Sequence, residues 1–400
     1  MSELSYLEKL LDGVEVKWLP LGHIAAIKTG QSVNKNMISK NPGVYPVINS
    51  GREPLGFINT WNTDNDPIGI TTRGAGVGSV IWQEGKYFRG NLNYSITIDK
   101  KSHINIRYMY HALLHMKNDI HELCTFDGIP ALNAGSLKKL LIPIPCPDNP
   151  EKSLAIQSEI VRILDKFTAL TAELTAELNM RKKQYNYYRD QLLSFDESSV
   201  EWKTLLEACD YVDYRGKTPK KTQSGIFLVT AKNIRMGYID YHASQEFISE
   251  EDYAIVMRRG LPKKGDVLIT TEAPCGFVAQ VNRENIALAQ RVIKYRSKNT
   301  QLSNSFLKHY LLGSQFQDKL MQAATGSTVK GIKGSRLHQL KIPIPSKVEQ
   351  DRIVAILDKF DTLTNSITEG LPREIELRQK QYEYYRDLLF SFPKPETVSN

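Results

Sequence analysis

The sequence has little cysteine and no long apolar run. Its four cysteines are spread over 400 residues without a CxxC pair, a pattern typical of reduced thiols and not of a disulfide framework or a zinc knuckle. Nowhere do roughly eighteen apolar residues follow one another, and residues 1–18 carry acidic side chains, which argues against a membrane span and a signal peptide. We therefore expect a cytosolic protein with no membrane partner.

Complete motifs for nucleotide binding or methyl transfer are also missing. RGAGVG (73–78) is followed by the strand-like SVIW, where a dinucleotide-binding fold needs a helix. YVDYRGKT (211–218) ends like a Walker A motif but has Tyr211 where the first glycine belongs. DNPEK (148–152) has Asn-Pro without the second proline and the aromatic residue of an amino-methyltransferase motif. These gaps disfavour NTP hydrolysis and methyl transfer by this chain.

Size and charge set broad limits. A chain of 400 residues is expected to form two or three domains. Hydrophobic residues make up 41% and charged residues 24%, which is ordinary for a folded protein. The formal net charge of +8 favours a polyanionic partner such as nucleic acid. Charge alone leaves that partner open, because many basic proteins bind no polyanion.

The chain contains an internal repeat. Residues 142–171, IPIPCPDNPEKSLAIQSEIVRILDKFTALT, recur at 342–364 as IPIPSKVEQDRIVAILDKFDTLT, and RKKQYNYYRDQLLSF (181–195) recurs as LRQKQYEYYRDLLFSF (377–392). Upstream, GITTRGAGVGSV echoes LITTEAPCGFV. The protein is therefore two copies of a unit of roughly 190 residues, each with a varied front part of strand-like runs and a near-identical helical back part.

Each back part has the periodicity of a long helix. The first contains TAELTAEL (171–178), which carries no reactive group but places leucines on one slowly drifting stripe. A helical run of about forty residues spans about 60 Å, and Gly370, Leu371 and Pro372 predict a break in the second run. Periodicity alone leaves homodimerisation open, but duplication favours an intramolecular antiparallel pair. The spacer positions expected on the seam are Leu170, Leu174, Leu178, Leu363 and Ile367.

This arrangement resembles a known family. A duplicated variable domain and helical region, with IPIP, ILDKF, TAELTAEL and QYxYYRD in this order, is similar to the specificity (S) subunit of type I restriction-modification systems, and the tandem TAEL looks most like the type IC branch. The resemblance implies that each of two target recognition domains reads one half of a split site in double-stranded DNA. It also implies two methyltransferase (M) and two restriction/motor (R) subunits as partners. They would bind S-adenosylmethionine, ATP and Mg²⁺ in a bacterial cytoplasm, with no cofactor on this chain.

We expect a mixed α+β fold. Two α/β target recognition domains would be separated by an antiparallel pair of long helices, an intramolecular coiled coil with a pseudo-twofold internal repeat. The expected boundaries are 1–150 for the N-terminal recognition domain with a short helix at 3–12, 151–197 for a central helical spacer region, 198–346 for the C-terminal recognition domain, 347–393 for a C-terminal helical spacer region and 394–400 for a tail.

The front parts carry residue types that read DNA. Arginine bridges guanine or clamps phosphate, asparagine bridges adenine, and glycine lets a backbone approach the duplex closely. Arg73 and Glu272 fall at equivalent repeat positions, which suits domains that read different bases, although a surface charge difference explains it equally well. The DNA-binding candidates are Asn49, Arg52, Thr72, Arg73, Gly76, Arg89, Asn91, Lys217, Thr218, Lys232, Asn233, Thr271, Glu272 and Arg291, and the partner-binding candidates are Tyr187 and Tyr384.

Two further groups of residues resemble a metal site and a nuclease motif only weakly. His111 and His115, followed by another histidine and a cysteine, have the spacing of zinc ligands, but the repeat places Gly313 where His115 stands, so we expect no metal. Asp66 and the EGK at 84–86 loosely imitate a nuclease motif, but this stretch is typical of a hairpin turn.

The sequence favours a non-catalytic, sequence-specific DNA-binding subunit, and the resemblance implies that the complete enzyme has DNA methyltransferase and ATP-dependent restriction endonuclease activities. Its helices would set the spacer between half-sites about one DNA turn apart, roughly 34 Å, and dock two methyltransferase subunits. Two alternatives stay open: a self-contained nuclease or DNA methyltransferase, and a coiled-coil scaffold that does not read DNA.

Overall fold

The computed structural model describes residues 6–51, 53–214, 219–366 and 368–393. The chain forms two compact units, one of residues 1–172 with 377–400 and one of residues 173–376. Each unit combines an α/β domain with part of the long helices. Four predicted site residues lie outside the described residues, namely Arg52, Lys217, Thr218 and Ile367.

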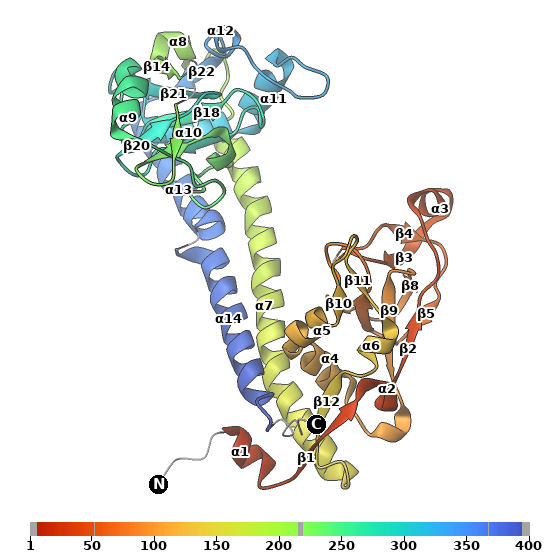
Figure 1. Ribbon diagram of the computed structural model, residues 1–400. Coiled ribbons are helices and arrows are strands. Elements are labelled where there is room, and N and C mark those ends of the chain that lie inside the picture. The colour runs from red at the N-terminus through yellow and green to blue at the C-terminus, as the bar shows by residue number, and fades with distance from the viewer. Residues whose placement is uncertain (1–5, 52, 215–218, 367, 394–400) are drawn as a thin grey trace, which may run out of the picture. The chain divides into compact units, whose positions relative to one another are not determined.

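The first unit is built on two four-stranded sheets (Figure 1). Their strands are β2 (Ala25–Thr29), β3 (Pro42–Ile48), β4 (Phe57–Ile58), β5 (Thr63–Asp64), β6 (Ile68–Thr71), β7 (Val80–Trp82), β8 (Lys86–Arg89) and β9 (Asn93–Ile98). One sheet is antiparallel with the order β2-β9-β6-β7, and the other has the order β4-β3-β8-β5 with β3 and β8 parallel. Because β7 and β8 lie in different sheets, residues 83–85 link two sheets, and the hairpin turn predicted at 83–86 is wrong.

Ribbons and helices complete this domain. β1 (Val16–Pro20) pairs with β12 (Leu141–Pro145), and β10 (Cys124–Thr125) pairs with β11 (Ala131–Leu132). The first helix ends at Leu11 instead of residue 12, because Asp12 and Gly13 have φ values of 48° and 73° that turn the chain out of the helix. The helices are α1 (Tyr6–Leu11), α2 (Leu21–Ile24), α3 (Lys35–Lys40), η1 (Lys100–Ser102), α4 (Ile106–His115), α5 (Lys117–Glu122) and α6 (Ala134–Leu137).

The second unit contains the matching set of strands. They are β13 (Glu201–Thr204), β14 (Cys209–Asp213), β15 (Lys221–Thr222), β16 (Ile226–Val229), β17 (Phe247–Ile248), β18 (Val267–Thr270), β19 (Val278–Gln280), β20 (Ile286–Leu288), β21 (Val292–Ser297) and β22 (Lys341–Ile344). The helices are α8 (Leu205–Ala208), η2 (Ala231–Asn233), α9 (Glu250–Val256), η3 (Met257–Arg259), α10 (Asn304–Leu312), α11 (Ser314–Ala323) and α12 (Gly334–Leu337).

The topology confirms the internal repeat. The second unit has an antiparallel sheet of order β14-β21-β18-β19, a second sheet of order β15-β17-β16-β20 with β16 and β20 parallel, and a ribbon of β13 with β22. These correspond to β2-β9-β6-β7, to the sheet with the parallel pair β3 and β8, and to β1 with β12. Two copies of one architecture therefore stand on sequences that differ in their front parts.

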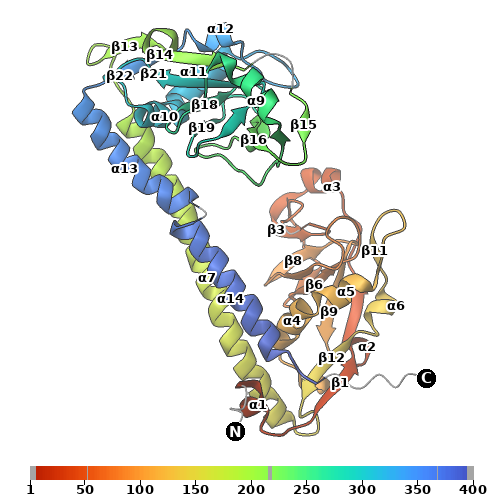
Figure 2. The same ribbon diagram turned by 60° about the vertical axis from the view of Figure 1, so that its left-hand side comes forward.

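Three helices carry the repeated back parts. They are α7 (Pro150–Leu192), α13 (Lys347–Asn365) and α14 (Gly370–Leu389). The N-termini of α7 and α13 are capped, because Asn149 accepts from the Lys152 amide at 3.1 Å and Ser346 accepts from the Glu349 amide at 3.3 Å. In the first unit α14 lies alongside the N-terminal half of α7 in both views (Figures 1 and 2).

The helices form an intramolecular antiparallel pair. In the first unit Phe167 of α7 stacks on Tyr385 of α14, with ring centroids 5.2 Å apart. In the second unit Tyr185 and Tyr188 of α7 stack on Phe360 of α13, at 6.0 and 5.9 Å. Residues nearer the C-terminus of α7 therefore contact residues nearer the N-terminus of the second helical run, so the two runs are antiparallel, as the repeat predicted.

The predicted break in the second helical run is confirmed. α13 ends at Asn365 and α14 begins at Gly370, with Pro372 in its first turn where the missing amide costs no hydrogen bond. Gly370 has φ +80°, and a Cβ there would lie 2.4 Å from the carbonyl oxygen of Thr362. Only glycine lets the chain pass this close to the end of α13.

The tandem leucines are less buried than a tight seam requires. Leu170 is 37% exposed, while Leu174, Leu178 and Leu363 are half-buried. The fully buried side chains of the helices lie outside the tandem, where α7 and α13 pack against the domains, for example Ile160, Leu164, Ile353 and Leu357. Within the described residues no helix has the length and apolarity to cross a membrane.

Candidate nucleic-acid interface

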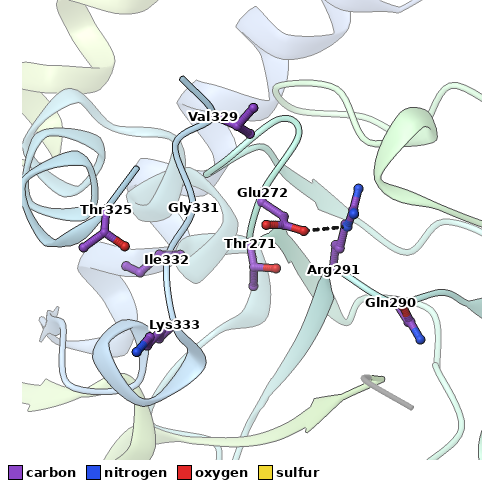
Figure 3. Close-up of a pocket in the computed structure, with 9 residues that line it drawn as sticks. All are labelled: Thr271, Glu272, Gln290, Arg291, Thr325, Val329, Gly331, Ile332 and Lys333. Carbon is purple, nitrogen blue, oxygen red and sulfur yellow. Dashed lines mark ion pairs between the residues drawn. The ribbon is translucent and has the colours of Figure 1, made fainter. Parts of the chain in front are cut away.

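A cavity of about 440 Å³ lies in the second unit where three chain segments meet (Figure 3). They are the end of β18, the turn between β20 and β21, and residues 325–333 before α12. The cavity brings together the DNA-binding candidates Thr271, Glu272 and Arg291. The complete lining is Thr271, Glu272, Gln290, Arg291, Thr325, Val329, Gly331, Ile332 and Lys333.

Main-chain hydrogen bonds hold these segments together. The Thr271 amide donates to the Arg291 carbonyl at 2.9 Å, and the Ile332 amide donates to the Thr271 carbonyl at 2.9 Å. Glu272 forms an isolated antiparallel bridge with Gly331. Backbone hydrogen bonds therefore fix the positions of the three segments that line the cavity.

Glu272 and Arg291 form an ion pair at the cavity. Nε of Arg291 lies 2.6 Å from Oε1 of Glu272, and the side chains point toward one another in Figure 3. Both stay accessible, with 56% of the Arg291 side chain and 45% of the Glu272 side chain exposed. A pair this solvated contributes little to stability, below ~1 kcal/mol. Both charged groups therefore remain accessible at the surface of the cavity.

The first unit repeats this backbone with different side chains. The Thr72 amide donates to the Leu92 carbonyl at 3.0 Å, and Arg73 forms an isolated bridge with β11. The equivalence of Arg73 and Glu272, predicted from the repeat, is thus confirmed in the pairing, and Leu92 stands where Arg291 stands. Equivalent edges of the two domains therefore present different chemistry.

The other surface candidates of the first unit gather around the same turn. Oδ1 of Asn49 accepts from the Leu92 amide at 2.9 Å, and Asn91 is exposed on the turn. Gly76 is half-buried, and a Cβ there would lie 3.1 Å from the Ser50 carbonyl oxygen. Ile129, which the sequence reasoning missed, is 67% exposed on the loop between β10 and β11.

Arg89 does not present its side chain to a ligand. It is buried, and its guanidinium donates to the carbonyl oxygens of Asp66 at 2.7 Å and Tyr94 at 3.2 Å and contacts the Tyr87 hydroxyl. Burial lowers the pKa of Arg89. The side chain joins the two sheets of the domain beside a cavity of about 370 Å³ that Lys28 also lines. The burial of Arg89 and its contacts inside the domain therefore count against a base contact.

Two more candidates face the interior. Asn233 is fully buried and donates from Nδ2 to the carbonyl oxygens of Asp240 and Ser244, at 2.9 and 2.8 Å, so it braces its own loop. Thr72 is also buried and acts through its backbone. Lys232, next to Asn233, is exposed. Among the candidates described, the accessible charged groups are thus Arg73, Lys232, Glu272 and Arg291.

The duplicated organisation of the chain matches a known protein family. The family described as the type I restriction modification DNA specificity domain matches residues 13–181 and again 202–377. The chain belongs to this family. The two matches coincide with the two copies found in the sequence and in the topology, so the family's domain occurs twice.

Curated relatives cover the whole chain. The chain is 45% identical to the Escherichia coli type I restriction enzyme EcoR124I/EcoR124II specificity subunit over 100% of both proteins. It is 35% identical to the E. coli EcoprrI specificity subunit over 92% of this chain and 93% of that protein. A crystal structure of the Mycoplasma genitalium type I S subunit has the same fold, with a TM-score of 0.58 and 18% identity over 98% and 99% of the two chains.

In the first unit of this specificity-domain protein, a buried histidine links the recognition domain to the helices. Nε2 of His111 on α4 lies 2.8 Å from Oδ1 of Asp165 on α7, and Nδ1 lies 2.9 Å from the Tyr382 hydroxyl on α14. Arg107 pairs with the same carboxylate. Burial lowers the pKa of His111, outweighing the opposite effect of Asp165. A neutral ring then donates from Nε2 and accepts at Nδ1 from Tyr382.

The second unit repeats only part of this joint. Nε2 of His309 lies 2.7 Å from Oδ1 of Asp358, and Lys308 contacts the same atom at 3.2 Å. Tyr185 holds the motif position of Tyr382, but within the described residues neither its hydroxyl nor Nδ1 of His309 has a hydrogen-bond partner. In the first unit His111 and His115, whose spacing matches that of zinc ligands, contact other side chains: His111 contacts Asp165 and Tyr382, and Nδ1 of His115 lies 2.9 Å from Oδ1 of Asp387.

The partner-binding candidates Tyr187 and Tyr384 are exposed by 63% and 65%. Each makes an edge contact with the next tyrosine, Tyr188 or Tyr385, at ring-centroid distances of 5.4 and 5.3 Å. Both units therefore expose the same pair of aromatic side chains on a helix.

Sequence reasoning missed Val329 and Lys333 of the cavity. Val329 is 57% exposed and holds the place of Ile129 in the other copy. The signal in the sequence that could have pointed to this loop is an apolar residue at the matching position of both copies, Ile129 and Val329.

Proposed function

We propose that this chain is the DNA-sequence-reading specificity subunit of a type I restriction-modification enzyme. Its recognition domains, residues 1–150 and 198–346, would each read one block of a bipartite asymmetric site. The helical regions, residues 151–197 and 347–393, would set the unread gap between the blocks. Full-length similarity to named specificity subunits supports this assignment.

One observation carries the proposal of two different readings. Equivalent backbone positions hold Arg73 and Leu92 in one domain and Glu272 and Arg291 in the other. Arginine favours guanine or phosphate, glutamate favours cytosine, and leucine offers only apolar contact. Identical scaffolds with such different edges suit two different base sequences, and not a palindrome.

We infer that the chain is not itself an enzyme and acts in the bacterial cytoplasm. S-adenosylmethionine, ATP and Mg²⁺ would be bound by two methyltransferase and two restriction/motor partners. The structure of a type I system described as showing complex assembly has a similar fold, with a TM-score of 0.51 and 16% identity.

Two copies of the methyltransferase would dock on the two exposed tyrosine pairs. Exposed aromatic residues are enriched at protein interfaces, and a repeated surface suits a repeated partner. Native mass spectrometry tests this: Tyr187→Ala or Tyr384→Ala should each leave a complex with one methyltransferase, and the double variant should leave none. Met180→Ala, which alters another exposed apolar residue of α7, is the control and should retain two.

Selection from randomised DNA duplexes tests the main proposal. The chain with its methyltransferase partner should enrich two specified blocks separated by a fixed unread gap. The isolated chain should show no turnover with S-adenosylmethionine or Mg²⁺. Enrichment of no motif would contradict DNA reading, and turnover by the isolated chain would favour the nuclease or methyltransferase alternative.

A further inference from the structure

The ion pair at the cavity of the second unit has an unusual backbone. Arg291 has φ +71°, in the left-handed region that non-glycine residues rarely adopt. Its carbonyl accepts from the Thr271 amide, so the main-chain ladder holds this conformation in place. Strained residues of this kind persist where the surroundings fix them, and they concentrate at functional sites.

The ion pair also occupies one edge of the guanidinium. Glu272 contacts Arg291 at Nε, 2.6 Å away. Within the described parts of the chain, Nη1 and Nη2 of Arg291 form no hydrogen bond. The two terminal nitrogens therefore remain as a fork, the geometry with which arginine binds two acceptors in one plane.

The neighbouring carboxylate selects against phosphate as the acceptor. A phosphate close to Arg291 would also lie close to the Glu272 carboxylate, which repels it and cancels the attraction of the guanidinium. The O6 and N7 acceptors of guanine carry no net charge and match the arginine fork. A partly neutralised, held arginine thus favours a guanine edge over the DNA backbone.

We propose that the second recognition domain reads a guanine in its half-site through Nη1 and Nη2 of Arg291, with Glu272 as the positioning residue that holds the fork and excludes phosphate. This inference rests on the proposed DNA-reading function. The first domain lacks the arrangement, because Arg73 and Leu92 hold the two positions. The guanine therefore belongs to the block read by residues 198–346.

Arg291→Gly is the most informative substitution. Glycine adopts a φ of +71° without strain, so the variant removes the guanidinium without straining the backbone. In selection from randomised duplexes, with the full chain bound to its methyltransferase partner, one guanine position of one block should lose its preference by roughly tenfold to hundredfold. Every other position of that block, and all of the other block, should keep their preferences.

Glu272→Gln tests the positioning role by a different readout. Removing the negative charge frees Arg291 to contact phosphate, so the guanine preference should weaken while the salt dependence of affinity steepens by about one phosphate contact, a slope change near 0.9. Arg291→Lys should lose the guanine preference without changing the slope. Lys333→Ala, an exposed cation on the same cavity, should leave all base preferences intact.

The outcomes separate the inference from the function on which it rests. If the unaltered complex selects no sequence, the proposed function fails and the guanine assignment fails with it. If the unaltered complex selects two blocks but Arg291→Gly leaves every position unchanged, weakens all positions equally or erases one whole block, the function stands and the guanine assignment is overturned.

Discussion

Replacing Tyr382 with phenylalanine should destabilise the first unit, whereas the matched change Tyr185→Phe should leave the second unit as stable or more stable. The Tyr382 hydroxyl donates to Nδ1 of His111 at 2.9 Å inside the joint between α4 and α14. Its loss leaves a buried acceptor unpaired. The Tyr185 hydroxyl is buried without a hydrogen-bond partner among the described residues, so its removal costs no hydrogen bond.

The expected size of the effect follows from this difference. A typical internal hydrogen bond contributes about 0.5–1.5 kcal/mol, and leaving a buried polar group unsatisfied costs about 1–3 kcal/mol. Tyr382→Phe should therefore lower the free energy of unfolding of the first unit by about 1–3 kcal/mol. For a unit of this size that corresponds to a fall in Tm of about 2–12 °C.

Differential scanning calorimetry of the full chain measures both variants under the same conditions. Because the two tyrosines hold the same position of the same motif, each variant is the other's control. Equal destabilisation by both substitutions, or a silent Tyr382→Phe with a costly Tyr185→Phe, would refute the reasoning from the hydrogen bond to His111.

The remaining predictions concern pH and a buried ion pair. Burial lowers the pKa of both His111 and His309, so the unfolded chain binds more protons than the folded chain near the unfolded pKa of about 6.5. Stability should therefore fall as the pH drops from 7.5 to 5.5. The double variant His111→Asn, His309→Asn should flatten this pH dependence of Tm. Although burial alone would raise it, hydrogen bonds from His309 and Lys308 lower the pKa of Asp358 to about 2, so stability from this carboxylate is present above about pH 4 and is lost only below it. Asp266 is buried and pairs with Arg296 at 2.6 Å and with Lys294 at 3.5 Å, so Asp266→Asn should cost about 3–5 kcal/mol in denaturant unfolding. Asp148→Asn, which breaks an exposed pair with Lys17, should cost far less, and equal costs of the two substitutions would count against the burial argument.

The repeat made most of the fold predictable. Near-identical back parts predicted two equivalent helical runs, and a Gly-Leu-Pro stretch predicted their one difference, because glycine and proline act on the local backbone. The predicted end of the first helix was one residue too late, because the helix ends where Asp12 adopts a positive φ. Aspartate tolerates this conformation but does not require it, so the sequence could not predict it.

The candidate site was only partly predictable. Residue type drew attention to Glu272 and Arg291, which the structure brings to one cavity. Residue type also suggested Arg89, whose strand buries three successive residues and turns its guanidinium inward. Local pattern cannot decide which charged strand residue is buried, since that depends on a second sheet packed from elsewhere in the sequence. The bridge between Glu272 and Gly331 joins positions far apart in the chain, so Val329 and Lys333 entered the site only through tertiary structure.

We expect the helices to set the gap between two independently read blocks. The most direct test deletes one tetrad, residues 175–178 of α7, and repeats the duplex selection with the methyltransferase complex. Four residues shorten a helix by about 6 Å and make about one turn, which corresponds to about two base pairs of 3.4 Å each. We expect the deletion variant to select the same two blocks, separated by a gap about two base pairs shorter than in the unaltered complex. An unchanged gap, or altered blocks at the original gap, would contradict it.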